Sequence, residues 1–336
     1  MQVAVIIPCR NEVNYIGACV RAALSQEYPA DQLKVYVVDG MSDDGTRELV
    51  NSEFQHETRV VLLDNPHRTT PYALNIGIMH AQADVAIIFG AHAEMMEGYV
   101  DRCVHILSND HSVGCVGGVI DNVNENEAAT YISQCMSSSF GVGNAHFRTG
   151  TAVGYVDTVA FGAYRSTIFH VVGYFDPALV RNQDDEFNYR LTKFGWKIYL
   201  DPTIRSRYYV RGSLRKLTRQ YYQYGYWKVY VNAIHKTITT WRQLIPFLFV
   251  TYLAMAVLAC LFAPTGAGLW LLPFLLYIGI SVKVSMSFGG NLRDWLYRML
   301  VFFVLHFSYG RGYAVGILRF LLLRKGPAAH ASTSSR

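Results

Sequence analysis

The feature that most constrains the fold is a pair of long apolar runs in the C-terminal third of the chain. Residues 244–263 contain no charged side chain, and residues 269–288 contain only Lys283, near one end. An apolar run of this length crosses a bilayer as a helix. The two runs therefore predict two membrane spans joined by a short turn at Pro264 and Gly266; the alternative is a buried hairpin in a soluble protein.

A third apolar part follows the two runs. Residues 299–309 are apolar but short for a span, and residues 310–312 (G-R-G) lead into a further apolar stretch that contains Arg319. This pattern predicts a re-entrant or interfacial helix, or a poor third span. The last residues, 326–336, are small and polar, and are expected to be disordered.

Charge divides the chain into two halves. Residues 1–201 carry 13 Lys/Arg against 24 Asp/Glu, whereas residues 202–336 carry 17 against the single acid Asp294, so the net charges are −11 and +16. Because the cations flank apolar runs, we expect a membrane surface as the partner and no nucleic acid. The positive-inside rule then places the front half in the cytosol, at a bacterial inner membrane. The alternative to a contact between these cations and the membrane surface is that they only set the topology of the chain.

The six cysteines have no metal-finger spacing and no C-x-x-C, which indicates reduced thiols of a cytosolic protein. The N-terminus lacks the basic residues of a signal peptide and is expected to form a first strand.

Strand-like and helix-like segments alternate in the front half. Four runs are apolar and β-branched, as strands are: residues 3–7, 34–38, 59–64 and 85–89. Helical patterns lie between them: one ends near residue 26, one begins at residue 46, and one covers residues 71–83. The alternation predicts an α/β fold with a mostly parallel sheet and helices on both faces. Polar and glycine residues follow each strand, at the edge of the sheet where ligands bind in such folds.

A cluster of acids follows Asn182, a candidate N-cap. Asp184, Asp185 and Glu186 would lie in the first turn of a helix, where the helix dipole favours ionised carboxylates. Mutual repulsion could leave one of them poised as a general base. The simpler alternative is a solvated acidic helix start.

Two loops after strands carry further candidates. Asp39 ends one strand and could accept from a base N–H or a ribose hydroxyl, while the residues after it could equally form an ordinary turn that caps a helix. His92 and Glu94 follow another strand. A divalent cation on a diphosphate needs only one or two protein ligands, which these side chains could supply; a structural histidine is the alternative.

Together these segments resemble the inverting family-two glycosyltransferases of the GT-A fold, in particular the bacterial succinoglycan-type exopolysaccharide glucosyltransferases. The resemblance covers residues 3–236. The matching segments are V-I-I-P-C-R-N-E (5–12), V-V-D-G-M-S-D-D-G-T (37–46), A-L-N-I-G-I (73–78), A-H-A-E (91–94), F-G-A-Y-R (161–165), G-Y-F-D (173–176), R-N-Q-D-D-E (181–186) and Q-Y-G-Y-W (223–227).

The resemblance implies roles for individual residues. Asp184 occupies the position of the catalytic base, with Asp185 as the alternative. His92 occupies the last position of the metal motif, with Glu94 beside it. The residues implied to contact the nucleotide sugar or the acceptor are Pro8, Arg10, Glu12, Asp39, Asp43, Asp44, Gln223 and Trp227.

Three positions depart from the family pattern. Gly90 replaces the first acid of the metal motif, and Gln183 replaces the Glu before the base. Tyr226 replaces an Arg, which argues against a processive synthase and removes a cation from the diphosphate site. Lys228 or Arg165 could supply that cation instead.

The resemblance thus implies an enzyme that moves a hexose, with glucose favoured, from a UDP-sugar to a lipid-linked (polyprenyl diphosphate) saccharide, with Mg²⁺ or Mn²⁺. The expected organisation is a catalytic domain at residues 1–212, interfacial helices at 213–243 and a membrane region at 244–325. A polyprenyl-phosphate glycosyltransferase and a non-catalytic scaffold of a polysaccharide assembly complex are the alternatives. The oligomeric state, a homo-oligomer included, stays open.

Overall fold

The computed structural model describes residues 1–143, 145–150, 153–210, 212–262 and 267–327. It forms two compact units: Met1–Val123 with Ala145–Tyr209, and Asn124–Asn144 with Val210–Arg336. The second boundary lies close to the predicted one at residue 212. The predicted first domain was continuous, whereas the structure assigns Asn124–Asn144 to the second unit. The turn expected at Pro264 and Gly266 and most of the expected disordered tail lie outside the described residues.

The first unit contains all the strands of the described chain. They are β1 (Val3–Cys9), β2 (Leu33–Asp39), β3 (Val60–Asp64), β4 (Val85–Ile88), β5 (Ala93–Met95), β6 (Val113–Asn124), β7 (Gly154–Val156), β8 (Ala160–Arg165) and β9 (Lys197–Val210). Its helices are α1 (Ile16–Leu24), η1 (Ala30–Gln32), α2 (Thr46–Glu53), α3 (Thr70–Ala81), α4 (Tyr99–Asn109), α7 (His146–Thr149), α8 (Thr167–Val171) and α9 (Gln183–Lys193).

These strands form one sheet in the order β3-β2-β1-β4-β8-β6-β9-β5, with β7 paired to β9. The first four strands are parallel, as their continuous apolar runs predict. Strand β8 runs antiparallel to both β4 and β6, and β9 runs antiparallel to β5 and β7. The α/β class is confirmed, but the sheet is mixed rather than mostly parallel.

Helices cover both faces of the sheet. Successive residues of β1 point to opposite sides, so that Val5 belongs to one apolar cluster and Ile6 to the other. The cluster around Val5 takes residues from α1, α2 and α4, whereas the cluster around Ile6 takes residues from α3, α8 and α9. Burial on both faces explains why β1 is apolar along its whole length.

The register of the parallel strands brings their ends together. Cys9 pairs with Asp39, and Asp39 pairs with Asp64, so β1, β2 and β3 end at the same level. The loops that leave these strands, and the loop after β4, therefore emerge at one edge of the sheet, as the sequence predicted.

The second unit is helical in the residues that the structure describes. Its helices are α5 (Glu127–Met136), α6 (Ser139–Val142), α10 (Leu214–His235), η2 (Trp241–Gln243), α11 (Leu244–Phe262), α12 (Ala267–Ser287), α13 (Leu292–Gly316) and η3 (Ile317–Leu322). Three stretches are long and apolar enough to cross a membrane: Trp241–Phe262, Gly268–Ser287 and Leu292–Leu322. The first two match the predicted spans. The third is the most buried of the three.

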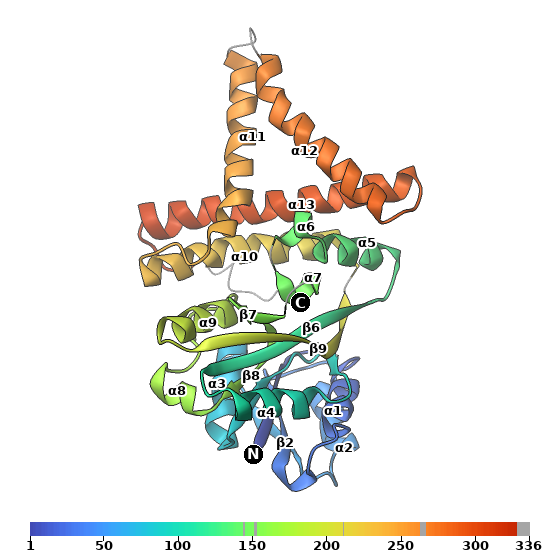
Figure 1. The fold of residues 1–336 in the computed structure, drawn as a ribbon, viewed down its shortest axis with the longest axis vertical. Helices are drawn as coiled ribbons and strands as arrows, with labels where there is room; N and C mark the ends of the chain where they lie inside the picture. The colour runs from blue at the N-terminus through green and yellow to red at the C-terminus, as the bar shows by residue number, and fades with distance from the viewer. Residues whose placement is uncertain (144, 151–152, 211, 263–266, 328–336) are drawn as a thin grey trace. The chain divides into compact units, whose positions relative to one another are not determined.

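Helices α10 and α13 lie side by side in the second unit (Figure 1). Glycines allow this close approach: a Cβ atom on Gly312 would lie 2.0 Å from the Tyr222 carbonyl oxygen, and one on Gly225 would lie 2.0 Å from the Tyr309 carbonyl oxygen. Since both obstacles are backbone atoms, no rotamer change can make room. The two helices therefore pack backbone against backbone.

We predict that Gly312→Ala lowers the stability of the protein, because its methyl group must push α10 and α13 apart. Gly279→Ala, in α12, is the matched control, since nothing lies within 4 Å of a Cβ at that position. Removing a helical glycine there should be neutral or stabilise by about 0.5–1 kcal/mol. Thermal unfolding in detergent measures both variants, and equal melting temperatures would contradict the packing described.

Candidate active site

Asp39 is the most enclosed acid of the candidate site. Its side chain is fully buried, and both of its oxygens accept hydrogen bonds within the protein. One oxygen accepts from the Ser42 hydroxyl and faces the Cys9 thiol at 3.7 Å. The other accepts from the Ser42 backbone N–H and from Arg47 Nη1, each at 2.9 Å. The contact of Asp39 with uracil stays a prediction. The N–H of a base would have to bond to an Asp39 oxygen that already accepts from one of these donors.

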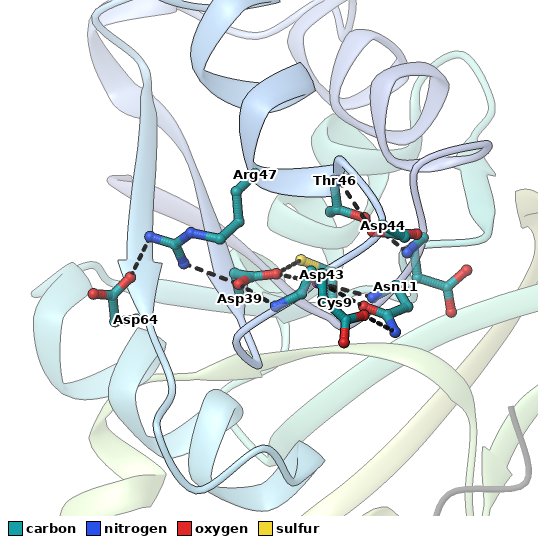
Figure 2. Close-up of polar contacts among 10 residues, drawn as sticks. Cys9, Asn11, Asp39, Asp43, Asp44, Thr46, Arg47 and Asp64 are labelled. Carbon is teal, nitrogen blue, oxygen red and sulfur yellow. Dashed lines mark hydrogen bonds and ion pairs between the residues drawn. The ribbon is translucent and has the colours of Figure 1, made fainter.

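Arg47 holds two acids at the strand edge (Figure 2). Its Nη1 bonds to Asp39, and its Nη2 bonds to Asp64 at 2.7 Å. Hydrogen bonds to these two carboxylates raise the pKa of the guanidinium above its ordinary value. Sequence reasoning missed this residue, although its place directly after D-D-G-T, next to an acidic strand end, is the signal that could have found it.

Asp43 and Asp44 fasten their loop to the segment after β1. Asn11 Nδ2 donates to Asp43 at 2.9 Å, and the Asp43 N–H donates back to Asn11 Oδ1 at 3.1 Å. Asp44 accepts from the backbone N–H groups of Val13 and Thr46. Burial alone would raise the pKa of Asp44, but these bonds and the Thr46 hydroxyl outweigh it and lower the pKa. Only the bond from the Thr46 N–H to Asp44 resembles the turn before a helix that the sequence left open; the N-cap of α2 is Gly45, and Asp43 contacts Asn11 instead.

The segment after β1 lines the same edge. Pro8 is buried within β1, while Arg10 is half-buried and its side chain covers Gly40. Glu12 is buried and its backbone N–H donates to the Thr46 hydroxyl at 2.9 Å. All three residues implied for the nucleotide pocket thus lie beside the loop after β2, and their contact with the nucleotide stays a prediction.

His92 lies against a carboxylate and an aromatic ring. Its Nδ1 is 3.6 Å from Glu12 Oε1, and its ring meets that of Tyr208 edge to face at 5.0 Å. Glu94 is engaged elsewhere: it accepts from the Tyr209 hydroxyl and lies 3.9 Å from Arg207. The carboxylate that the structure places beside His92 is therefore Glu12, and the metal role of Glu94 stays a prediction.

The side chains at His92 fit a divalent cation that is also bound by the diphosphate of a nucleotide. Among the described residues, no three His, Cys, Asp or Glu side chains cluster to hold a metal ion alone. Diphosphate oxygens and waters can complete a shell that takes one or two protein ligands. His92, with Glu12 beside it, can supply that number.

Gly90 is covered by an aromatic ring. A Cβ atom at this position would lie 2.9 Å from Phe161 Cε1. Phe161 has a positive φ of 50°, an unusual value for a bulky residue, and its carbonyl accepts from the Tyr99 hydroxyl at 2.6 Å. Its ring packs on Phe89, with the centroids 4.6 Å apart. The ring thus occupies the space that an acid at position 90 would need.

The three acids of α9 have different surroundings. Glu186 is buried and bonds to Arg190 through both oxygens, at 2.7 and 2.9 Å. Arg190 also donates to backbone carbonyls before the helix, so this pair is structural. Asp184 is exposed and Asp185 is half-buried, both in the first turn. These two acids, as predicted, are the candidates for the base.

A chain of hydrogen bonds fixes the start of α9 at the edge of the sheet. Asn188 accepts from the Tyr164 hydroxyl at 3.0 Å and donates to the Thr158 hydroxyl at 3.0 Å. Asp184 lies one helical turn before Asn188 and so shares its face of the helix. Burial raises the pKa of Tyr164, and the charges of Cys115 and Asp184 add to this effect.

Strand register puts Asp184 and His92 at one edge. Since β8 runs antiparallel to β4, with Ile87 opposite Ala163, the start of β8 lies beside the carboxyl end of β4. Thr158, which holds α9, precedes β8 by two residues. The candidate base, the histidine and the loop around Asp39 therefore all belong to the carboxyl edge of the parallel strands.

Arg165 lies at the other edge, which corrects one expectation. It pairs with Val85, the first residue of β4. Its guanidinium donates to the carbonyls of Val113, Leu107 and Asp110, near the end of α4. The suggestion that Arg165 supplies a cation to the diphosphate was therefore wrong.

Gln223, Trp227 and Lys228 belong to α10 of the second unit. All three are buried, and Trp227 meets the rings of Tyr226 and Tyr230 edge to face. Their predicted contacts with donor and acceptor stay predictions.

We predict that Gly90→Ala costs about 1–3 kcal/mol, the usual cost of overpacking, because the methyl group meets the Phe161 ring. In a Phe161→Ala background the same change should cost less, since the obstacle is gone. A double-mutant cycle from chemical denaturation measures the coupling, and an equal cost in both backgrounds would show that Phe161 does not determine the residue at position 90.

Two relatives of this chain are known glycan-biosynthesis proteins. Succinoglycan biosynthesis protein ExoA of Rhizobium meliloti is 27% identical over 94% of this chain and 95% of its own length. A dolichyl N-acetylglucosaminyl phosphate diacetamido-dideoxy-glucuronosyltransferase of Methanococcus voltae is 30% identical over 66% of this chain and 71% of its own.

Solved structures share the fold. A mannosyltransferase of Pyrobaculum calidifontis, in complex with GDP-Man and Mn²⁺, aligns with a TM-score of 0.64 at 19% identity, over 92% of this chain and 86% of its own. S. aureus TarS, in complex with UDP-GlcNAc, gives a TM-score of 0.53 at 14% identity, over 94% and 91%. Residues 4–171 match the family described as "Glycosyl transferase family 2". The chain therefore belongs to glycosyl transferase family 2, and it is a nucleotide-sugar glycosyltransferase.

Proposed function

We propose that the protein is an inverting hexosyltransferase that uses a UDP-sugar, with UDP-glucose favoured, and a lipid-linked saccharide on polyprenyl diphosphate. The observation that carries the proposal is the shared sheet edge of Asp184, His92 and the loop that Asp39 holds together. A base, a candidate cation ligand and a nucleotide loop at one edge are the parts that glycosyl transfer from a nucleotide sugar requires.

Asp184 performs the proton transfer in this mechanism. Its carboxylate takes the proton of the acceptor hydroxyl while that oxygen bonds to the anomeric carbon, on the face opposite the leaving group. The bond from the anomeric carbon to the diphosphate oxygen breaks, and UDP leaves with the electron pair. The transition state resembles an oxocarbenium ion, as in glycoside hydrolysis. An α-linked donor therefore gives a β-linked product.

A divalent cation, Mg²⁺ or Mn²⁺, would neutralise charge on the departing diphosphate. His92 would hold it, and Glu12 Oε1, 3.6 Å from Nδ1, would orient the imidazole so that its other nitrogen faces the ligand. The named contents of the Pyrobaculum structure, GDP-Man and Mn²⁺, support a cation of this kind.

The acceptor assignment draws on relatives and on the membrane helices. ExoA takes part in succinoglycan biosynthesis, and the Methanococcus enzyme is named for a dolichyl-linked sugar phosphate. Apolar stretches long enough to cross a bilayer would keep the enzyme where a lipid-linked acceptor lies. The excess of cations before the first of them supports a cytosolic first unit at a bacterial inner membrane.

We predict that Asp184→Asn lowers turnover by roughly 10²–10⁴-fold, the usual worth of a positioned base, without changing the melting temperature. Asp184 is exposed, so the amide costs little in folding. Asp185→Asn, in the same helical turn, is the matched control and should keep most of the activity. The reverse pattern, with activity lost in Asp185→Asn and kept in Asp184→Asn, would make Asp185 the base.

We also predict that EDTA abolishes transfer, that Mg²⁺ or Mn²⁺ restores it, and that His92→Ala weakens Mn²⁺ binding in the presence of UDP. Electron paramagnetic resonance of free Mn²⁺ measures the binding directly. Glu94→Gln is the matched comparison: because Tyr209 and Arg207 already engage this carboxylate, we expect a smaller loss of binding than in His92→Ala, and an equal loss would give Glu94 the metal role that its motif implies. Unchanged Mn²⁺ binding in His92→Ala would show that His92 is not a ligand of the cation.

The donor and acceptor are tested in one screen of the purified full chain. UDP-glucose, other UDP-hexoses and GDP-mannose are offered with either polyprenyl phosphate or a polyprenyl diphosphate-linked saccharide. We expect transfer from a UDP-hexose to the saccharide. Transfer to polyprenyl phosphate alone, or from GDP-mannose alone, would contradict the proposed substrates while leaving the reaction type intact.

A further inference from the structure

Helix α13 carries an apolar stripe whose N-terminal half is exposed. Leu292, Leu296 and Leu300 are 65%, 55% and 46% exposed, and Phe303 and Phe307 continue the same stripe as half-buried side chains. Spacings of three and four residues place all five on one side of a helix.

The opposite face of α13 packs within the second unit. Arg298, Phe302 and Leu305 are buried there. Arg298 donates to Gln134 of α5 at 2.7 Å and to the Ser285 carbonyl of α12 at 3.0 Å. The exposed stripe is therefore the outer side of a helix with a fixed rotation.

Helix α11 meets α13 near the middle of α13. A Cβ on Gly310 would lie 2.1 Å from the Pro246 carbonyl, and Phe249 contacts both Phe303 and His306. These contacts involve only the first turns of α11, and Figure 1 shows α11 rising away from α13. The two helices cross and do not run alongside each other.

Only one of two crossing helices can follow the membrane normal. Helix α11 carries no charge along its 19 residues, and Ala256 is its only buried residue; the others are exposed or half-buried. A helix of this length that is apolar throughout and so little buried within its own protein lies in hydrocarbon and crosses it. Helix α13 must then run along the membrane.

Helix α10 supports the same orientation of α13 by a separate observation. It lies beside α13 with its backbone against the glycines of that helix. It also carries Arg215, Lys216 and Arg219, which are exposed. A spanning α13 would carry these cations towards the bilayer interior, where exposed charges are expensive.

We propose that α13 lies in the plane of the bilayer, at the boundary between headgroups and acyl chains, with lipid against its exposed leucine and phenylalanine stripe. The hairpin of α11 and α12 crosses the membrane. Arg293 and Arg311 are 18 residues apart, about five turns, and so share one edge of α13 beside the stripe. Both are exposed, and at this depth they meet lipid phosphates.

Depth measurements with spin labels on the full chain in liposomes test this orientation. Single cysteines replace Leu292, Leu296, Leu300 and Phe307 in a Cys260→Ser parent, whose five other cysteines are buried. Accessibility to oxygen and to a water-soluble nickel complex gives the depth of each label. We expect one shallow depth for all four labels, although the outer two are about 22 Å apart along the helix.

Labels at Leu248, Met255 and Phe262 of α11 provide the matched control. They are exposed and cover about 21 Å of helix, so their depths should pass through the bilayer centre. A depth gradient along α13 as steep as that along α11 would overturn the proposal. Labels on α13 that neither reagent reaches would also overturn it, because a second copy of the chain, and not lipid, would then cover the stripe.

Discussion

The carboxyl ends of four parallel strands bring the candidate catalytic residues of this protein to one edge of the sheet. Cys9, Asp39 and Asp64 stand in register, so the loops that follow β1, β2 and β3 leave the sheet at the same level. The loop after β4 delivers His92 to that edge, and the antiparallel return of β8 brings α9 to it. Without this register, residues separated by more than a hundred positions would share no surface.

A network of buried polar groups keeps the edge in order. Asp39 lies without solvent contact, and Arg47, Ser42 and Cys9 surround its carboxylate. A buried acid that loses its cation is costly, so Arg47 and Asp39 depend on each other. Arg47 also reaches Asp64, which ties the ends of two neighbouring strands to the first turn of α2. The loop is thereby held in one arrangement by the protein itself, and under the proposed function this would lower the entropy lost when a nucleotide binds.

The second unit combines apolar helices with a cationic one. Apolar helices long enough for a bilayer must be joined to a helix, α10, that carries exposed cations. Glycines at the crossings let backbones approach without side chains between them, a device that membrane helices use because lipid gives no hydrophobic drive for association. Arg298 links α5, α12 and α13 through amide and carbonyl groups, so that its charge is stabilised by hydrogen bonds although it is buried.

The sequence by itself determined the parallel strands, the edge at which they end, the acidic start of α9 and the two apolar helices, because each is a local pattern of burial or charge. Tertiary structure decided what distant residues do to one another. Three contacts join positions far apart in the chain: the Phe161 ring lies over Gly90, the Glu12 carboxylate lies beside His92, and the Arg165 guanidinium donates to backbone carbonyls. The direction of α13 was undecided for the same reason: its composition fits a span, and only its crossing with α11 and its contact with α10 distinguish the membrane plane from the membrane normal.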